Sequence, residues 1–204
     1  MTKQTEPLSV IGICGSLREG SYTRMALAIA MQGAGELGAE TRILDLGDYD
    51  LAFVDGRNTP YPAGVQRLRE DLRAANGIII GTPEYHAGMS GVLKNALDLM
   101  GFEEIGGKML GLIGVSGGTM GAVNALNSLR AVGRALHAWV IPQQVTIPQA
   151  WKVFNEDGGL QDEQYRERLL DVGRQVARFA FLHSSQEVQE FLKMWEQAPP
   201  NPGG

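Results

Sequence analysis

Residues 15–24 (GSLREGSYTR) bring hydroxyl and guanidinium groups together with two glycines, directly before a stretch with helical spacing. Ser16, Ser21 and Thr23 supply the hydroxyls, and Arg18 supplies the guanidinium fork. These groups, together with the unpaired N–H groups of a helix start, suit a phosphate monoester dianion. The segment matches neither GxxxxGK[ST] nor GxGxxG, which argues against ATP hydrolysis and a standard dinucleotide site. In the alternative interpretation, Ser21 only caps the helix and Arg18 is solvated.

Residues 82–91 (TPEYHAGMSG) place an aromatic ring, a carboxylate, an imidazole and a thioether on a segment shaped by proline and glycine. An aromatic and a methionine on such a loop can offer apolar surface and backbone N–H groups to a flat ring system. We therefore expect residues 84–89 to bind a ligand. Ser90 is instead predicted to cap the next helix, and Lys94 to form an exposed i, i+4 pair with Asp98.

Residues 116–121 (SGGTMG) contain the adjacent glycines Gly117 and Gly118. Without Cβ atoms, this backbone can lie close to a planar ring. Taken alone, the segment is explained more simply as a turn before a helix that Ser116 or Thr119 caps.

Each of these segments follows a short apolar run without alternation, at residues 8–14, 77–81 and 109–115. Such runs, closed by Gly, Ser or Thr, are typical of strands that are covered on both faces. Weaker strands are expected at residues 41–46 and 139–147.

Segments with helical spacing alternate with these five strands. This alternation requires parallel strands with right-handed crossovers and helices on both faces. We predict an α/β fold, a flavodoxin-like doubly wound five-stranded parallel sheet of order 2-1-3-4-5, with its ligand at the carboxyl ends of the strands. Residues 1–182 would form this domain, and residues 183–204 a C-terminal helix and disordered tail. The expected helices are residues 23–37, 62–75, 90–100, 120–136 and 162–182, with one more at 184–196.

The composition of the chain argues against several classes of protein. With 18 basic and 23 acidic side chains the formal net charge is −5, which gives no general positive field for nucleic acid. No apolar run approaches the roughly 18–20 residues of a membrane span, and the start MTKQTEP lacks a signal-peptide layout. The single cysteine, Cys14, suits a reducing compartment, and three scattered histidines predict no metal site. We expect a cytoplasmic protein.

Read together, GSLREGSYTR, TPEYHAGMSGVLKNALD and VSGGTMG resemble the NADPH-dependent FMN reductase family, flavodoxin-like enzymes that reduce free flavin, quinones, azo compounds or oxyanions. The likeness in element order covers roughly residues 8–180, and the middle segment is its most specific part. The family often has asparagine at the positions of Tyr22 and His86, so backbone contacts to FMN are expected there. The FMN contacts that the resemblance implies are Ser16, Arg18, Ser21, Tyr22 and Thr23 at the phosphate, Pro83, Glu84, Tyr85 and His86 at the ribityl chain and ring edge, and Ser116, Gly117 and Gly118 beside the ring.

The resemblance also implies a reaction. Hydride would pass from NADPH or NADH to flavin N5, and a small acceptor would then collect the electrons in a ping-pong cycle that needs no acid–base side chain. No catalytic side chain is therefore expected. A carboxylate beside reduced flavin would be unfavourable, so Glu84 is expected to point away and accept backbone hydrogen bonds. The family further implies a homodimer or homotetramer.

Two other functions fit the same fold. An electron-carrier flavodoxin would bind FMN without an NADPH site, although residues 15–24 lack the Thr-Gly-x-Thr pattern of that phosphate loop. A non-catalytic protein could keep the fold with or without FMN. A carrier would not be reduced by NADPH alone, and a protein without a flavin site would not take up FMN.

Overall fold

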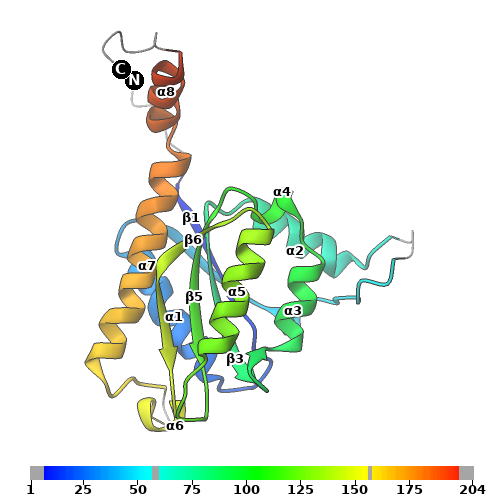
Figure 1. Ribbon diagram of the computed structural model, residues 1–204, viewed down its shortest axis with the longest axis vertical. Coiled ribbons are helices and arrows are strands. Elements are labelled where there is room, and N and C mark those ends of the chain that lie inside the picture. Colours follow the sequence, from blue (N-terminus) through cyan, green and yellow to red (C-terminus); the bar gives the residue numbers. More distant parts are fainter. Residues whose placement is uncertain (1–6, 57–59, 156–157, 198–204) are drawn as a thin grey trace.

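A parallel sheet with helices on both faces organises the chain (Figure 1). The computed structural model describes residues 7–56, 60–155 and 158–197. The parallel strands lie in the order β2-β1-β3-β5-β6. Their bounds are β1 Ser9–Cys14, β2 Glu40–Asp45, β3 Gly77–Tyr85, β5 Met109–Val115 and β6 Trp139–Ile147. The doubly wound α/β class predicted from the sequence is confirmed.

The strand count differs from the predicted five. A sixth strand, β4 (Gly88–Met89), pairs antiparallel with the end of β3, off the main path of the sheet. The numbered order therefore reads β2-β1-β3-β5-β6 instead of 2-1-3-4-5. The prediction also ended the third strand at Gly81, whereas β3 continues to Tyr85 because Thr82 and Pro83 still align with β5.

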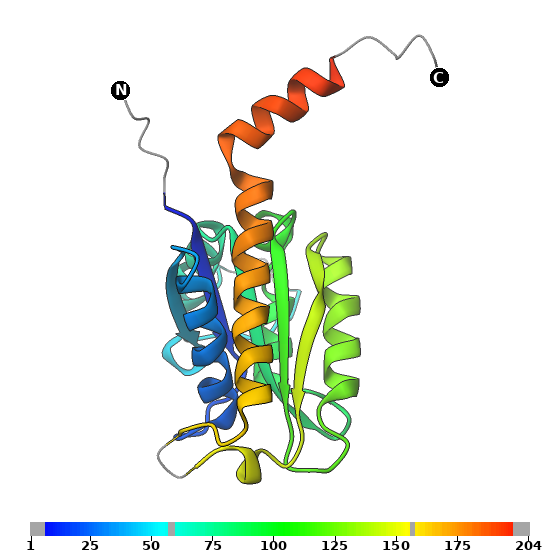
Figure 2. The same ribbon diagram turned by 90° about the vertical axis from the view of Figure 1, so that its left-hand side faces the viewer.

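Two groups of helices cover the two faces (Figure 2). Helices α1 and α7 pack on one face, and α2, α3, α4 and α5 pack on the other. The longer ones are α1 Tyr22–Gly35, α2 Ala63–Arg73, α3 Gly91–Asp98, α5 Val123–Ala135, α7 Glu163–Ser184 and α8 Gln186–Glu196. Short turns are η1 Leu46–Asp48, α4 Phe102–Ile105 and α6 Ala150–Val153.

Each predicted helix is found with its ends shifted by at most three residues, and two of these shifts bear on the site and on the predicted domain division. Helix α5 begins at Val123 instead of residue 120, because Gly121 has φ 69° and cannot belong to a right-handed helix. Helix α7 continues to Ser184, so the predicted division after residue 182 falls inside it. The predicted tail lies mostly in residues 198–204, outside the described residues.

The apolar strands owe their pattern to two cores. In β3, Ile79 belongs to the core under α1 and α7, while Ile78 and Ile80 belong to the core under α2, α3 and α5. Because successive side chains of a strand point to opposite faces, both faces must be apolar. This explains why the central strands have no polar alternation.

Helices α1 and α7 approach so closely that glycine is required at their contact. A Cβ atom on Gly33 would lie 2.1 Å from the Leu170 carbonyl oxygen, and one on Gly173 would lie 1.8 Å from the Ala30 carbonyl oxygen. These distances are too short for any side chain. No helix in the described ranges is long and apolar enough to cross a bilayer.

We expect Gly173→Ala to lower the free energy of unfolding by about 1–3 kcal/mol, the usual cost of forcing extra volume into a packed contact. The methyl group would meet the backbone of α1 and push the two helices apart. The matched control is Gly35→Ala, where a Cβ meets nothing within 4 Å and a stabilisation of about 0.4–1 kcal/mol is expected. Denaturant titration measures both. Equal stability of the two variants would contradict the close contact.

Candidate functional site

The three segments singled out in the sequence meet at the carboxyl edge of the sheet, the lower edge in Figure 1. The Gly15 N–H donates to the Gly81 carbonyl at 2.8 Å, which joins the first segment to β3. Pro83 aligns with Val115, directly before the third segment. Adjacent parallel strands therefore hold the three segments side by side, as the fold prediction required.

The first segment ends in a capped helix start. Ser21 has extended backbone, and its hydroxyl accepts from the Arg24 N–H at 3.4 Å, so the predicted capping role is confirmed. Ser16 is buried, and its hydroxyl accepts from the Arg18 N–H at 3.4 Å. Thr23 is buried against Gly81. These contacts give the loop a fixed shape.

The donors of this segment remain available to a ligand. Arg18 is exposed, and its guanidinium forms no hydrogen bond or ion pair with any residue the structure describes. Tyr22 and Thr23 open α1, where backbone N–H groups have no intrahelical acceptor. The nearby Asp45 carboxylate is paired with Arg24 at 3.1 Å, which offsets its negative charge. A helix start with one free cation beside it has the chemistry to hold an anion.

The Tyr22 side chain packs against another aromatic ring. Its ring stacks on Phe154, with centroids 5.5 Å apart and planes at 18°. The Tyr22 side chain therefore has an aromatic partner of its own, and a backbone contact to FMN at this position stays a prediction.

The second segment is a tight hairpin between β3 and β4. Glu84 aligns with Met89 and Tyr85 with Gly88, and the two turn residues, His86 and Ala87, have φ of 50° and 61°. Two left-handed residues are the geometry of a type I′ turn, which usually uses asparagine and glycine. The turn holds Tyr85 at the sheet edge, 47% exposed, and leaves His86 exposed as well.

Glu84 is turned toward a helix start. Its carboxylate accepts from the Ala125 N–H at 2.9 Å, in the first turn of α5. A negative charge is favoured there by the unpaired N–H groups and the helix dipole. The expectation that Glu84 accepts a backbone hydrogen bond is confirmed, and its contact positions the hairpin relative to α5.

Ser90 has a wider role than the predicted helix cap. Its hydroxyl accepts from the Leu93 N–H at 3.2 Å, which confirms the cap, and also donates to the Gly15 carbonyl at 2.6 Å. Its own N–H donates to the Thr82 hydroxyl at 3.2 Å. Ser90 therefore ties the first segment to the second. The predicted exposed pair of Lys94 and Asp98 is also present, at 2.6 Å.

The third segment is held by backbone hydrogen bonds at Ser116 and Gly118, while Gly117 has free space beside it. Ser116 donates from its N–H to the Ile147 carbonyl at 2.9 Å, and its hydroxyl accepts from the Gly118 N–H at 2.9 Å. The Gly118 carbonyl accepts from the Gln149 N–H at 3.0 Å. A Cβ atom on Gly117 would meet nothing within 4 Å. The backbone at Gly117 is thus open to a ring.

Cys14 is the last residue of β1, directly before the first segment. The free thiol is fully buried, and its sulfur lies 3.5 Å from the Ser16 carbonyl oxygen. Burial raises the pKa of the Cys14 thiol, so the thiol stays neutral and packs as a small apolar group. Within residues 7–56, 60–155 and 158–197, no three His, Cys, Asp or Glu side chains are grouped to hold a metal ion.

The residues present fit a flavin mononucleotide. An exposed guanidinium and a helix start match its phosphate, while the open backbone at Gly117 and the exposed Tyr85 ring match a flat tricycle. The one carboxylate of the hairpin is held at α5.

Ser90→Ala should lower the free energy of unfolding by about 1–3 kcal/mol, because the buried Gly15 carbonyl and Leu93 N–H would each lose a partner. Ser128→Ala, on the exposed face of α5, is the control and should unfold like the parent protein. Chemical denaturation followed by circular dichroism compares them. If Ser90→Ala is as stable as the control, Ser90 does not fasten the two segments.

Comparisons with known proteins identify the family of the chain. A family model for NADPH-dependent FMN reductase matches residues 8–152. An NADPH azoreductase from Bacillus sp. (strain OY1-2) is 37% identical over 187 residues, which cover 91% of this chain and 98% of that protein. An NAD(P)H-dependent FMN reductase from Pseudomonas aeruginosa is 35% identical over 168 residues, with coverages of 80% and 90%.

A solved oxidoreductase from Corynebacterium diphtheriae shares the fold, with a TM-score of 0.72 at 16% identity over 88% of this chain and all of that one. The family match covers most of the sheet and all three site segments. The chain belongs to the NADPH-dependent FMN reductase family.

Proposed function

We propose that this protein takes hydride from NADPH or NADH and delivers the electrons to a small flat acceptor, with FMN bound at the carboxyl edge of the sheet. Bound FMN would supply the hydride-accepting chemistry at its N5 atom. The observation that carries the proposal is the pairing, on one sheet edge, of a free guanidinium at a helix start with open backbone at Gly117. The first suits the phosphate, and the second suits the ring.

The side chains have positioning roles in this proposal. Arg18 and the start of α1 bind the phosphate, with Ser16 and Ser21 shaping the loop through their hydrogen bonds to the backbone. Glu84 keeps its negative charge at the start of α5 and orients the hairpin. The hairpin then presents Tyr85 and His86 at the exposed edge. None of these groups has to move a proton for hydride transfer.

The exposed surface of the three segments favours a planar acceptor. Leu17 is 59% exposed and Met120 is 85% exposed, on the first and third segments respectively. Exposed apolar side chains beside open backbone suit an aromatic quinone, an azo compound or a second flavin better than a strongly hydrated oxyanion. The nicotinamide and the acceptor would occupy the same open place in turn, which gives ping-pong kinetics. A cytoplasmic location and a homodimer or homotetramer stay predictions.

A reduction assay tests the proposal against the two other functions. Purified protein is mixed with FMN, desalted, and then given NADPH in the absence of oxygen. If the protein is the proposed enzyme, it retains FMN after desalting, and NADPH bleaches the visible absorption band of that FMN. The FMN of an electron carrier stays yellow until a partner reductase is added. Failure to bind FMN would refute the proposal outright. Parallel double-reciprocal plots with a benzoquinone or an azo dye, and slow reduction of chromate, would support a ping-pong reaction with flat acceptors.

Arg18→Ala should weaken FMN binding by about 1.5–3 kcal/mol, the loss typical of a hydrogen bond to a charged group. That loss corresponds to roughly a 10- to 150-fold rise in Kd. Arg134→Ala removes an exposed arginine near the end of α5 and serves as the control, with unchanged affinity expected. Quenching of FMN fluorescence measures both constants. An unchanged Kd for Arg18→Ala would remove Arg18 from the phosphate site.

Gly117→Val should reduce FMN occupancy without loss of stability, because its side chain would fill the space proposed for the ring and its Cβ atom would meet no protein atom within 4 Å. Gly117→Ala, with only a methyl group, should reduce occupancy less. The ratio of flavin to protein absorbance after desalting gives the occupancy, and thermal unfolding checks the fold. Full occupancy in Gly117→Val would place the ring elsewhere.

A further inference from the structure

Helix α6 lies at the carboxyl edge of the sheet, the lower end of the molecule in Figures 1 and 2, and carries a tryptophan and a lysine side by side. Trp151 is 58% exposed, and Lys152 is exposed as well. The Lys152 ammonium lies over the Trp151 ring, 4.9 Å from its centroid. An exposed indole with a cation beside it suits a flat ring that bears a negative group.

Backbone hydrogen bonds join α6 to the third segment. The Ala150 N–H donates to the Ser116 carbonyl at 3.1 Å, next to the bond from Gln149 to Gly118. Gln149 has φ 43°, an uncommon conformation for a residue with a side chain, which the surrounding contacts must hold. Trp151 therefore directly follows a residue that is bonded to the backbone beside the open position at 117.

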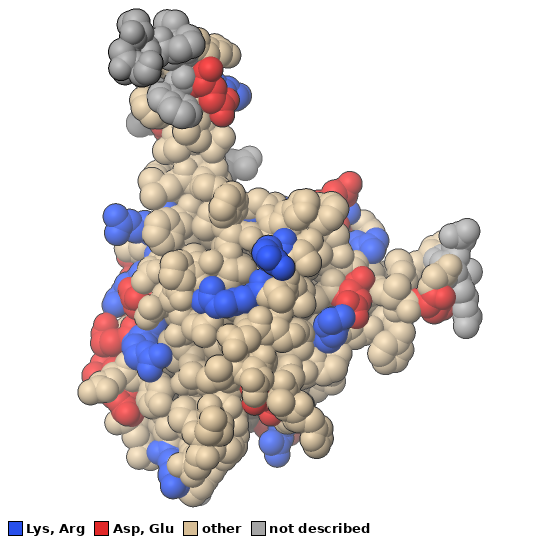
Figure 3. Space-filling model, viewed as in Figure 1, with Lys and Arg blue, Asp and Glu red and all other residues tan. Residues whose placement is uncertain are grey.

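The other end of α6 contacts the first segment. Phe154 is buried and stacks on Tyr22, the first residue of α1. Residues 149–154 thus bridge the third segment and the start of α1. Figure 3 shows a mostly uncharged surface at this lower end of the molecule. We expect a ligand that extends beyond the open space at Gly117 to have α6 within its reach.

Lys152 has no acidic partner among the residues that the structure describes. Its ammonium donates to the Gln149 side-chain oxygen at 3.3 Å, a long hydrogen bond to a neutral group. By contrast, Arg24 is already paired with a carboxylate, and the Arg130 guanidinium already donates to a side-chain amide oxygen and to two backbone carbonyls. Because the cation–π contact of an exposed side chain is weak, Lys152 can turn its charge to a ligand.

The chain belongs to a family of NADPH-dependent enzymes, and NADPH has a part that matches this pair of side chains. It carries a phosphate on the 2′ oxygen of its adenosine ribose, where NADH has a hydroxyl. Adenine is a flat ring that can stack on an aromatic side chain, and a lysine ammonium binds phosphate as a point charge. Trp151 and Lys152 offer these two groups next to each other.

We propose that Trp151 and Lys152 form the adenosine subsite for NADPH: the Trp151 ring stacks on the adenine, and the Lys152 ammonium binds the 2′-phosphate. The proposal rests on the proposed function, which puts the nicotinamide at the open backbone of Gly117. Lys152 is then a specificity-determining residue, because it contacts the group that distinguishes NADPH from NADH. It takes no part in hydride transfer.

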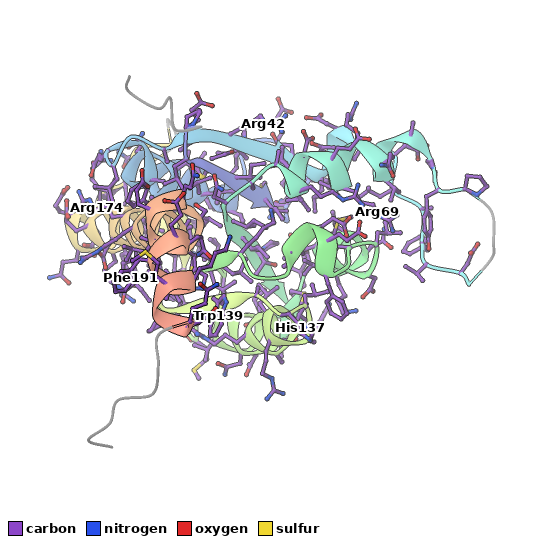
Figure 4. All side chains as sticks on the ribbon, turned by 90° about the horizontal axis from the view of Figure 1, so that it is seen from above. Arg42, Arg69, His137, Trp139, Arg174 and Phe191 are labelled. Atoms are coloured by element: carbon purple, nitrogen blue, oxygen red, sulfur yellow. The ribbon has the colours of Figure 1, made fainter. Side chains whose placement is uncertain are left out.

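Two residues with the same chemistry at other places serve as controls. The Arg168 guanidinium lies 5.8 Å from the centroid of the Tyr165 ring on α7, and that ring is half-buried against the core. Trp139 is 60% exposed, much like Trp151, but it opens β6 at the end of the strand opposite the third segment. Figure 4 looks onto that opposite end and shows Trp139 there.

The first test measures the binding of adenosine 2′,5′-bisphosphate to FMN-saturated protein by calorimetry, so that the phosphate site at Arg18 is already filled. Lys152→Gln should raise the Kd of this probe by roughly 10- to 150-fold, the loss of one hydrogen bond to a charged group, and leave that of adenosine 5′-monophosphate unchanged. Lys152→Arg, which keeps the charge, should bind like the parent protein. Trp151→Ala should weaken the binding of both nucleotides.

The controls Arg168→Gln and Trp139→Ala should bind both nucleotides like the parent protein, and thermal unfolding shows that each variant keeps its fold. An unchanged Kd of the bisphosphate in Lys152→Gln or in Trp151→Ala would overturn the proposal.

The second test separates this subsite from the reaction, by measuring reduction of a benzoquinone with NADPH and with NADH. Lys152→Gln should lower kcat/KM for NADPH by a similar factor through a higher KM, with kcat and both constants for NADH unchanged. A parental ratio of the two kcat/KM values in this variant would refute the subsite and leave the reaction standing. Bisphosphate binding that depends on Lys152, in a protein whose FMN neither nucleotide reduces, would support the subsite and refute the reaction.

Discussion

Parallel alignment of β1, β3 and β5 is the constraint on which the site depends. Their carboxyl ends stop at one edge, and the hydrogen bonds of Gly15 with Gly81 and Ser90 fix the spacing of the first two segments beyond it. Glu84 extends the same framework to α5. None of these contacts needs a ligand to form. The arrangement proposed to bind FMN is therefore formed in advance, which would lower the ordering cost of binding.

The two edges of the sheet have opposite characters. The carboxyl edge exposes backbone donors, a guanidinium and a few isolated apolar side chains, as a site for a charged planar ligand requires. The other edge carries the outward helix α8 and, at its base, a groove of mixed polar and apolar lining. Helices α5 and α7 run between the two edges.

Most of the sheet could be predicted from the sequence because buried parallel strands consist of short runs without polar residues, such as residues 109–115. Strand β4 could not be predicted, since two residues show no periodicity, and a turn through His86 and Ala87 lacks the usual glycine. The Ser90 cap could be predicted from local pattern alone. The bond from Ser90 to Gly15 joins residues 75 positions apart, so local pattern carries no sign of it.

The glycine contact between α1 and α7 has a mechanical consequence. With Gly33 and Gly173 letting the two backbones touch, α1 cannot slide or tilt unless α7 moves with it. The helix that opens at the first segment is thereby packed rigidly against the helix that leads to α8. The two helices therefore form one rigid unit on this face of the sheet, and a displacement of α7 would carry α1 with it.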